Sequence, residues 1–193
     1  RAIKSGYVVL GIGIVIIDYF LLTMYDVLAF KNEKLQLSNL KIIFTSFISY
    51  AFANSIGLSG LTGSGLRINL YSLWNVPYKS IIKVIKFCYV SFWVGLLWVG
   101  GLFLTFEPVD LTRFNFYFDT TKEVGIILLI IASSYSAHKV FSKKKSLEIS
   151  VFQILISLLD WILVSGLIYI FLPHSDTLTF IKFFPIFLSA QII

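Results

Sequence analysis

The sequence predicts an all-α integral membrane protein, a polytopic bundle of helices, and two observations carry this prediction. Hydrophobic residues make up 58% of the 193-residue chain, charged residues only 13%, and the mean hydropathy is +0.88. Soluble globular domains carry about 25% charged residues. The apolar residues also form continuous runs of about the 20 residues that a helix needs to cross a bilayer. An open chain can satisfy its backbone polar groups in lipid only as helices, so we expect spanning helices.

The apolar runs set the expected order of the helices: residues 7–30, 40–58, 81–106, 124–141, 149–172 and from 180 onwards. Short connectors, rich in charged or turn-forming residues, separate them. The runs are continuous and about twice as long as the ten-residue alternating strands of a transmembrane barrel, which excludes that architecture. We therefore expect one transmembrane domain over residues 1–193, with no soluble domain.

A polar, glycine-rich stretch at residues 54–71, NSIGLSGLTGSGLRINLY, interrupts this apolar pattern. Its glycines are Gly57, Gly60, Gly63 and Gly65. Each costs about 1 kcal/mol against alanine inside a helix, so we expect a broken or re-entrant segment here rather than a regular spanning helix. In lipid, such backbone survives only around a protected cavity, which makes this stretch the candidate functional site.

Five polar residues inside the apolar sequence need an explanation: Asp18, Asp26, Asn54, Arg67 and Asp160. A charge at the centre of a spanning helix costs about 2.5 to 3.5 kcal/mol, and such groups usually face a cavity or one another. Asp18 and Asp26 are eight residues apart, about 12 Å along one helix face, so one of them could meet Arg67. The alternative is that these aspartates are solvated near the membrane surface.

Arg67 has the strongest case for a functional role, because its guanidinium is permanently charged and binds phosphate through two parallel hydrogen bonds. Phospholipid headgroups supply that phosphate. The nearby hydroxyls of Ser59, Thr62 and Ser64, and backbone N–H groups of the glycine stretch, could complete an anion site of the nest type. The alternative is that Arg67 reaches to the membrane surface and that the glycines only permit close helix packing.

The basic residues indicate which side of the membrane each connector faces. Lysine-rich connectors face the cytoplasm, so we place there Lys139, the lysines at 143–145, and a helical stripe of Lys79, Lys83 and Lys86. The acidic connector at 107–123 then faces outward. The lysine stripe suits either attraction to anionic lipid or ordinary anchoring.

The side on which residues 31–41 lie remains open at this point. Lys31, Lys34 and Lys41 fall outside if residues 40–58 span the membrane, and inside if residues 40–65 are re-entrant. Charge counting does not separate these two topologies.

Catalysis by this chain alone finds little support. The sequence contains no nucleophile elbow, histidine-based triad or P-loop. One cysteine, Cys88, and two histidines, His138 and His174, do not make a metal cluster or a disulfide. We expect no cofactor, no metal and no nucleic acid bound by this chain.

Several ordered segments resemble the lysylphosphatidylglycerol synthase transmembrane family. They are TMYDVLA at 23–29, SYAF at 49–52, the glycine stretch running into SLW at 72–74, KVIKFC at 83–88 and LDW at 159–161. The resemblance covers nearly the whole chain. Within the family it is greatest to the flippase domain of bacterial phosphatidylglycerol lysyltransferases of the multiple peptide resistance type.

The resemblance implies a lipid flippase of the bacterial cytoplasmic membrane that moves lysyl-phosphatidylglycerol between leaflets and gives resistance to cationic antimicrobial peptides. Family members continue beyond the segment matching residues 189–193 into a second glycine-rich element, so we expect a fragment truncated at both ends. Two alternatives remain: a membrane anchor that feeds substrate to a cytosolic aminoacyltransferase domain, which uses aminoacyl-tRNA, and a flippase or scaffold for another polar lipid.

We expect the headgroup to be bound by residues of the polar stretch and by the membrane aspartates. The exposed glycine and aromatic surfaces also suit a homo-oligomer. The candidate headgroup-binding residues are Asp18, Asp26, Asn54, Ser59, Gly60, Thr62, Gly63, Ser64, Arg67, Tyr71 and Asp160.

Overall fold

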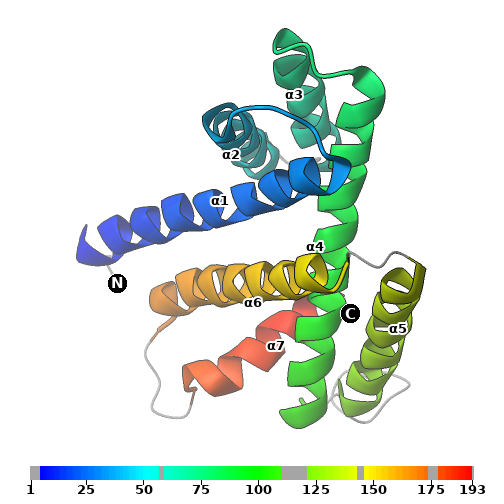
Figure 1. Cartoon of the computed structure of the whole chain (residues 1–193). Helices are drawn as coiled ribbons and strands as arrows, with labels where there is room; N and C mark the ends of the chain where they lie inside the picture. Colours follow the sequence, from blue (N-terminus) through cyan, green and yellow to red (C-terminus); the bar gives the residue numbers. More distant parts are fainter. Residues whose placement is uncertain (1–4, 57–58, 110–120, 143–145, 174–177, 193) are drawn as a thin grey trace. The chain divides into compact units, whose positions relative to one another are not determined.

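The computed structural model describes residues 5–56, 59–109, 121–142, 146–173 and 178–192, and all regular structure in them is helical. The all-α prediction is confirmed. The helices are α1 (Ser5–Glu33), α2 (Asn39–Ile56), α3 (Ser59–Leu73), α4 (Tyr78–Phe106), α5 (Thr121–Ser142), α6 (Ser146–Phe171) and α7 (Phe180–Ile192), shown in Figure 1. Expectations for Gly57, His174, most of the acidic connector and the lysines at 143–145 lie outside the described residues.

Among the described helices, α1, α4 and residues 151–171 of α6 are long and apolar enough to cross a membrane. The helices α2 and α3 are shorter, with 18 and 15 residues. At 1.5 Å per residue they measure about 27 Å and 22 Å, less than the roughly 30 Å of a hydrocarbon core. The chain is therefore a helical membrane protein that also contains helices below spanning length, α2 and α3 among them.

The glycine stretch was expected to break the pattern of regular spanning helices, and from Ser59 onwards it forms a helix that is below spanning length. The helix α3 runs without interruption through Gly60, Gly63 and Gly65 to Leu73. Packing against α2 outweighs the low helix propensity of glycine, since tertiary contacts routinely override such preferences. The helix before this stretch, α2, ends at Ile56, and α3 begins at Ser59.

The chain divides into two compact units. One comprises residues 15–92, and the other comprises residues 1–14 together with 93–193, so that α1 and α4 each contribute to both. We call them the hairpin unit and the aromatic unit.

The hairpin unit is named for α2 and α3, which pack side by side in opposite directions (Figure 1). Near one end, the ring centroids of Phe44 and Trp74 lie 6.4 Å apart. Towards the other end, Gly63 packs against Ala53 and Ser49 of α2. The second half of α1 and the first half of α4 complete this unit, and Phe47 of α2 packs on Tyr19 and Phe20 of α1.

The aromatic unit is held by rings of α7 that contact α4 and α6. Phe184 lies edge-on to Phe103 with centroids 4.6 Å apart, and Phe187 lies 6.0 Å from Trp161. The helices α4 and α5 approach closely because Gly101 and Gly125 lack side chains. An added Cβ at Gly125 would meet Thr105 Oγ1 at 2.5 Å.

Candidate functional site

The carboxylate of Asp26 is the meeting point of all four helical segments of the hairpin unit. Asp26 lies on α1 and is fully buried. Its Oδ2 accepts hydrogen bonds from Ser46 of α2 at 2.7 Å and, more weakly, from the Cys88 thiol of α4 at 3.5 Å. Its Oδ1 accepts a hydrogen bond from the Tyr71 hydroxyl of α3 at 2.9 Å.

Arg67 of α3 provides the countercharge. Its Nε donates to Asp26 Oδ1 at 2.9 Å and its Nη2 donates to Oδ2 at 2.8 Å, which is the two-pronged arrangement that a guanidinium makes with a carboxylate. The Nη1 group donates to the Gly63 carbonyl at 3.4 Å. The guanidinium carbon also lies 4.4 Å from the centroid of the Tyr50 ring, a cation–π contact.

Gly63 makes room for this arrangement. A Cβ at this position would lie 3.2 Å from the Ala53 Cβ, 3.3 Å from Arg67 Nη1 and 3.4 Å from the Ser49 carbonyl oxygen. Because Gly63 has no side chain, α2 can approach α3 closely and the Arg67 guanidinium fits beside it. At Gly60 and Gly65 a Cβ would meet nothing within 4 Å.

Two alternatives from the sequence are wrong. Asp26 is not solvated at the membrane surface, because none of it is exposed, and Arg67 does not reach to the surface, because only 6% of it is exposed. The hypothesis that one of the two α1 aspartates meets Arg67 is confirmed, and Asp26 is that residue. Close packing through a glycine, the other alternative, also occurs, but at Gly63 it coexists with the ion pair.

The structure brings together Asp26, Gly63, Arg67 and Tyr71 of the expected residues. It adds three that the sequence did not single out: Ser46, Tyr50 and Cys88. For Ser46 alone, a signal lay in the hydroxyl residues of α2, where Thr45, Ser46 and Ser49 interrupt an otherwise apolar run. A spanning-type segment that buries hydroxyls at helical spacing predicts a polar partner on a neighbouring helix.

Other expected residues lie elsewhere. Asp18 is buried in α1, about 12 Å before Asp26 by helix rise. Asn54 and Gly60 are exposed, while Thr62 and Ser64 are half-buried. Asp160 is buried in the aromatic unit, and the side chain of Ser59 lies outside the described residues.

This cluster is an ion pair whose carboxylate is fully supplied with hydrogen-bond donors. Two opposite charges neutralise one another, and five donor contacts from α2, α3 and α4 reach one carboxylate. Arg67 has five N–H groups, of which three have a hydrogen-bond acceptor given above. Removing one partner from such a pair strands a buried charge and costs about 3 to 5 kcal/mol. A ligand with both charges could instead replace each partner by one of its own groups.

No group of three or more His, Cys, Asp or Glu residues lies together in the part of the chain that the structure describes. Few backbone N–H groups of α3 are free to bind an anion. In a helix that begins at Ser59, only the first four N–H groups lack helical acceptors, so those of Gly63 and Gly65 are used within α3.

The fold and this cluster define a class: helical membrane proteins in which a buried ion pair joins four helical segments. Comparison with known proteins shows which members of this class the chain resembles. No family model matches the chain. An uncharacterized protein of Synechocystis sp. is 38% identical over 192 residues, which cover 93% of this chain and 60% of that protein.

Two further relatives carry informative names. The inner membrane protein YbhN of Escherichia coli is 26% identical over 89% of this chain and 58% of its own length. The phosphatidylglycerol lysyltransferase of Staphylococcus aureus is 22% identical over 89% of this chain and 21% of its own length. The chain is a distant relative of these membrane proteins, as the resemblance predicted, and it spans about three fifths or less of each of them.

Proposed function

We propose that this chain forms the headgroup site through which a bacterial cytoplasmic-membrane protein moves lysyl-phosphatidylglycerol between leaflets. The single observation that carries the proposal is the Asp26–Arg67 pair, buried in a membrane protein and shared by four helical segments. Intramembrane ion pairs of this kind commonly mark a substrate pathway. The distant relation to a phosphatidylglycerol lysyltransferase supports the choice of lipid.

The headgroup of lysyl-phosphatidylglycerol carries both charges that the pair uses. Its phosphate is an acceptor for the Arg67 fork, and its ammonium groups are donors for the Asp26 carboxylate. The headgroup could therefore replace the Asp26–Arg67 contact by two charge-assisted contacts of its own. No charge is then left unpaired at any stage, which lowers the cost of taking the headgroup through a medium of low dielectric constant.

Tyr50 and Tyr71 have supporting roles in this proposal. The Tyr50 ring faces the guanidinium, and its π-face can stabilise a cation whether Arg67 is paired or not. The Tyr71 hydroxyl donates to Asp26 and can equally accept from an ammonium group. The expected physiological outcome is a less negative outer leaflet, which weakens the adsorption of cationic antimicrobial peptides.

A second candidate function has its own support. The lysyltransferase relative is about five times as long as the region matched here, since that region covers 21% of it. The same membrane part could anchor a transferase domain and feed it phosphatidylglycerol. In that case the ion pair would support synthesis rather than translocation, and the full-length protein would be the enzyme.

The test measures lysyl-phosphatidylglycerol in the outer leaflet and in total lipid for cells or proteoliposomes that contain the full-length protein. We compare wild type, Arg67→Ala and Asp26→Asn, with Lys182→Gln, an exposed lysine of the aromatic unit, as the control. With both lipid amounts normalised to folded protein, the proposal predicts that the first two variants lower the outer-leaflet lipid while total lipid holds, and that the control matches wild type.

Two other outcomes separate the alternatives. A fall in total lysyl-phosphatidylglycerol with an unchanged outer fraction assigns the membrane part to the transferase. Unchanged values of both in well-folded Arg67→Ala protein contradict any role of the pair in lipid handling.

A further inference from the structure

Six lysines gather at the ends of the helices in the hairpin unit. They lie at the C-terminal end of α1, the start of α2 and the start of α4: Lys31, Lys34, Lys41, Lys79, Lys83 and Lys86. We call this set the lysine rim. All six are exposed, and Lys83 keeps 64% of its side chain exposed even though it contacts an acid.

Two contacts bring these helix ends to one side of the unit. Lys83 of α4 pairs with Glu33, the last residue of α1, at 3.1 Å. Lys41, in the first turn of α2, lies over the ring of Trp74, which directly follows α3, at 5.5 Å from its centroid. The end of α1, the start of α2, the end of α3 and the start of α4 therefore share one side.

This arrangement decides between the two topologies that the sequence left open. If residues 40–58 crossed the membrane and α3 did not return, Lys41 and Trp74 would lie at opposite membrane surfaces, which their contact forbids. The α2–α3 hairpin begins and ends on the same side, so the lysines of α1 and α2 face the same side as those of α4. Under the rule for lysine-rich connectors this is the cytoplasmic side.

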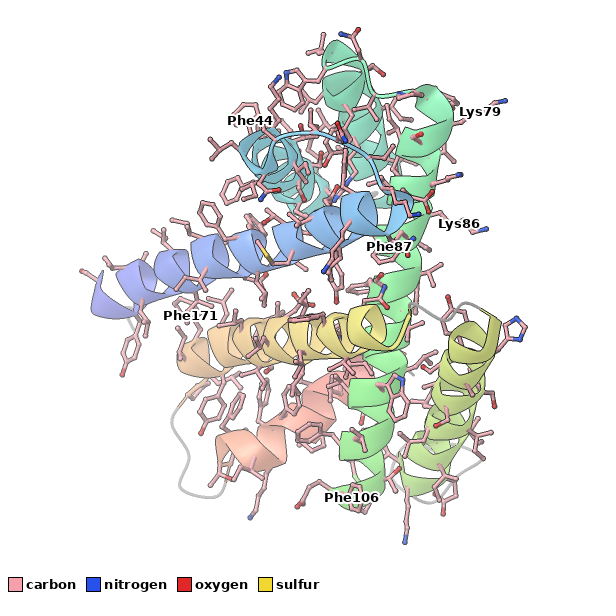
Figure 2. All side chains as sticks on the ribbon, in the orientation of Figure 1. Phe44, Lys79, Lys86, Phe87, Phe106 and Phe171 are labelled. Carbon is pink, nitrogen blue, oxygen red and sulfur yellow. The ribbon has the colours of Figure 1, made fainter. Side chains whose placement is uncertain are left out.

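The lysines of the rim outnumber the acids of their unit that are not buried. The acidic residues of residues 15–92 are Asp18, Asp26 and Glu33, and the two aspartates are buried. Glu33 is the remaining acid, and it already pairs with Lys83. Lys79 and Lys86 have no ion pair within the described residues, and Figure 2 shows both side chains extending outward from α4.

Apolar side chains lie directly beside these lysines. Leu40 is 81% exposed, Tyr78 61% and Ile82 39%, so the starts of α2 and α4 each present a cation next to an exposed apolar side chain. A phospholipid has the matching pattern, with an anionic phosphate above apolar chains. A soluble polyanion has the charge without the chains, so it would leave these apolar groups uncovered.

We propose that the lysine rim binds the phosphates of anionic phospholipids in the cytoplasmic leaflet and so concentrates them at the hairpin unit. The inference does not depend on which lipid is translocated. It does place the bound phosphate near the ion pair. Asp26 lies seven residues before Glu33, and Arg67 six before Leu73, so the pair is about 10 Å below the ends of α1 and α3 by helix rise, and Lys86 lies only two residues before Cys88, which contacts Asp26.

The test compares two double variants of the full-length protein that remove the same charge. Lys79→Gln with Lys86→Gln alters the rim and spares the Lys83–Glu33 pair. Lys122→Gln with Lys182→Gln removes two exposed lysines of the aromatic unit and is the matched control. Binding of phosphatidylglycerol and phosphatidylcholine is titrated by native mass spectrometry from micelles, with thermal unfolding as the check on folding.

A lysine near an anionic surface contributes about fivefold in binding, so the rim variant, which removes two lysines, should lose about 25-fold of its preference for phosphatidylglycerol over phosphatidylcholine. The control should keep most of that preference, and both should unfold like wild type. Equal losses in the two variants, or no loss in the rim variant, would overturn the proposal.

A heparin titration decides the identity of the anion. If the rim variant weakens binding of heparin but leaves the preference for phosphatidylglycerol unchanged, the rim serves a soluble polyanion and the lipid proposal is wrong. Arg67→Ala tests the ion pair: if it stops translocation but binds phosphatidylglycerol normally, the result concerns the headgroup site and not the lysine rim. The two proposals can therefore fail separately.

Discussion

The hairpin unit and the aromatic unit each pack helices within a membrane protein, but they do so through different interactions. In the hairpin unit, side chains from α2, α3 and α4 converge on the one carboxylate of Asp26. In the aromatic unit, the rings of α7 stack along α4 and α6, from Phe103 to Trp161. Hydrogen-bonded charges are directional and specify one geometry, whereas ring packing tolerates small shifts.

This difference indicates in which unit substitutions should affect function. A membrane protein that only needed stable packing could use rings and small residues throughout, because charged groups in lipid are costly. The hairpin unit nevertheless buries an ion pair, and it does so beside the lysine rim. Substitutions in the two units should therefore differ in kind: loss of lipid movement in the hairpin unit, and loss of stability alone in the aromatic unit.

The largest effect is expected for Arg67→Ala. It leaves the Asp26 carboxylate buried without its countercharge, which should cost about 3 to 5 kcal/mol of stability. Thermal unfolding of the full-length protein in lipid nanodiscs measures this loss. Asp26→Asn combined with Arg67→Gln removes both charges and keeps polar groups for Ser46 and Tyr71, so it should regain most of the stability. A double variant as unstable as Arg67→Ala would contradict the ion-pair explanation.

The sequence predicted that one aspartate of the first apolar run could meet Arg67, but neither which one nor what surrounds the pair. Asp26 and Arg67 stood out because charges in apolar segments need partners, and only a few candidates existed. Ser46 and Cys88 could not be assigned, because their role depends on which faces of α2 and α4 turn towards α1. That choice is made by tertiary packing, which periodicity in nearly uniformly apolar helices does not encode.

The glycines are a second case in which the sequence alone does not give the structure. The glycines predicted a segment that forms no regular spanning helix; α3 is helical because its packing on α2 outweighs the cost of its glycines, but it has only 15 residues. Gly60, Gly63 and Gly65 look alike in the sequence. Only the structure shows that Gly63 faces Ala53 and Arg67 while the other two face open space.

A smaller but still severe effect is expected for Gly63→Leu. The new side chain must displace either the guanidinium or the facing α2 backbone, an overpacking cost of about 1 to 3 kcal/mol. We expect lipid translocation to fall sharply. Gly65→Leu is the matched control, because a Cβ there meets nothing within 4 Å, and it should leave translocation near wild type. Equal losses at both positions would show that helix composition, not the seat of Arg67, matters.

The smallest effect on lipid movement is expected for Phe187→Ala in the aromatic unit. It removes ring contacts with Trp161 and Phe183, so the unfolding temperature should fall. Translocation per folded molecule should change little, because the ion pair belongs to the other unit. The measurement pairs an unfolding curve with translocation normalised to folded protein. A translocation loss as large as that of Gly63→Leu would remove the functional distinction between the units.

The most direct test of the account is lipid translocation by the double variant Asp26→Asn with Arg67→Gln, assayed in proteoliposomes with lysyl-phosphatidylglycerol. If the pair binds the headgroup, the double variant folds with nearly wild-type stability but moves no lipid, because neither charge is available to the phosphate or the ammonium. If translocation returns together with stability, the pair only holds the helices together, and the proposed headgroup site is wrong.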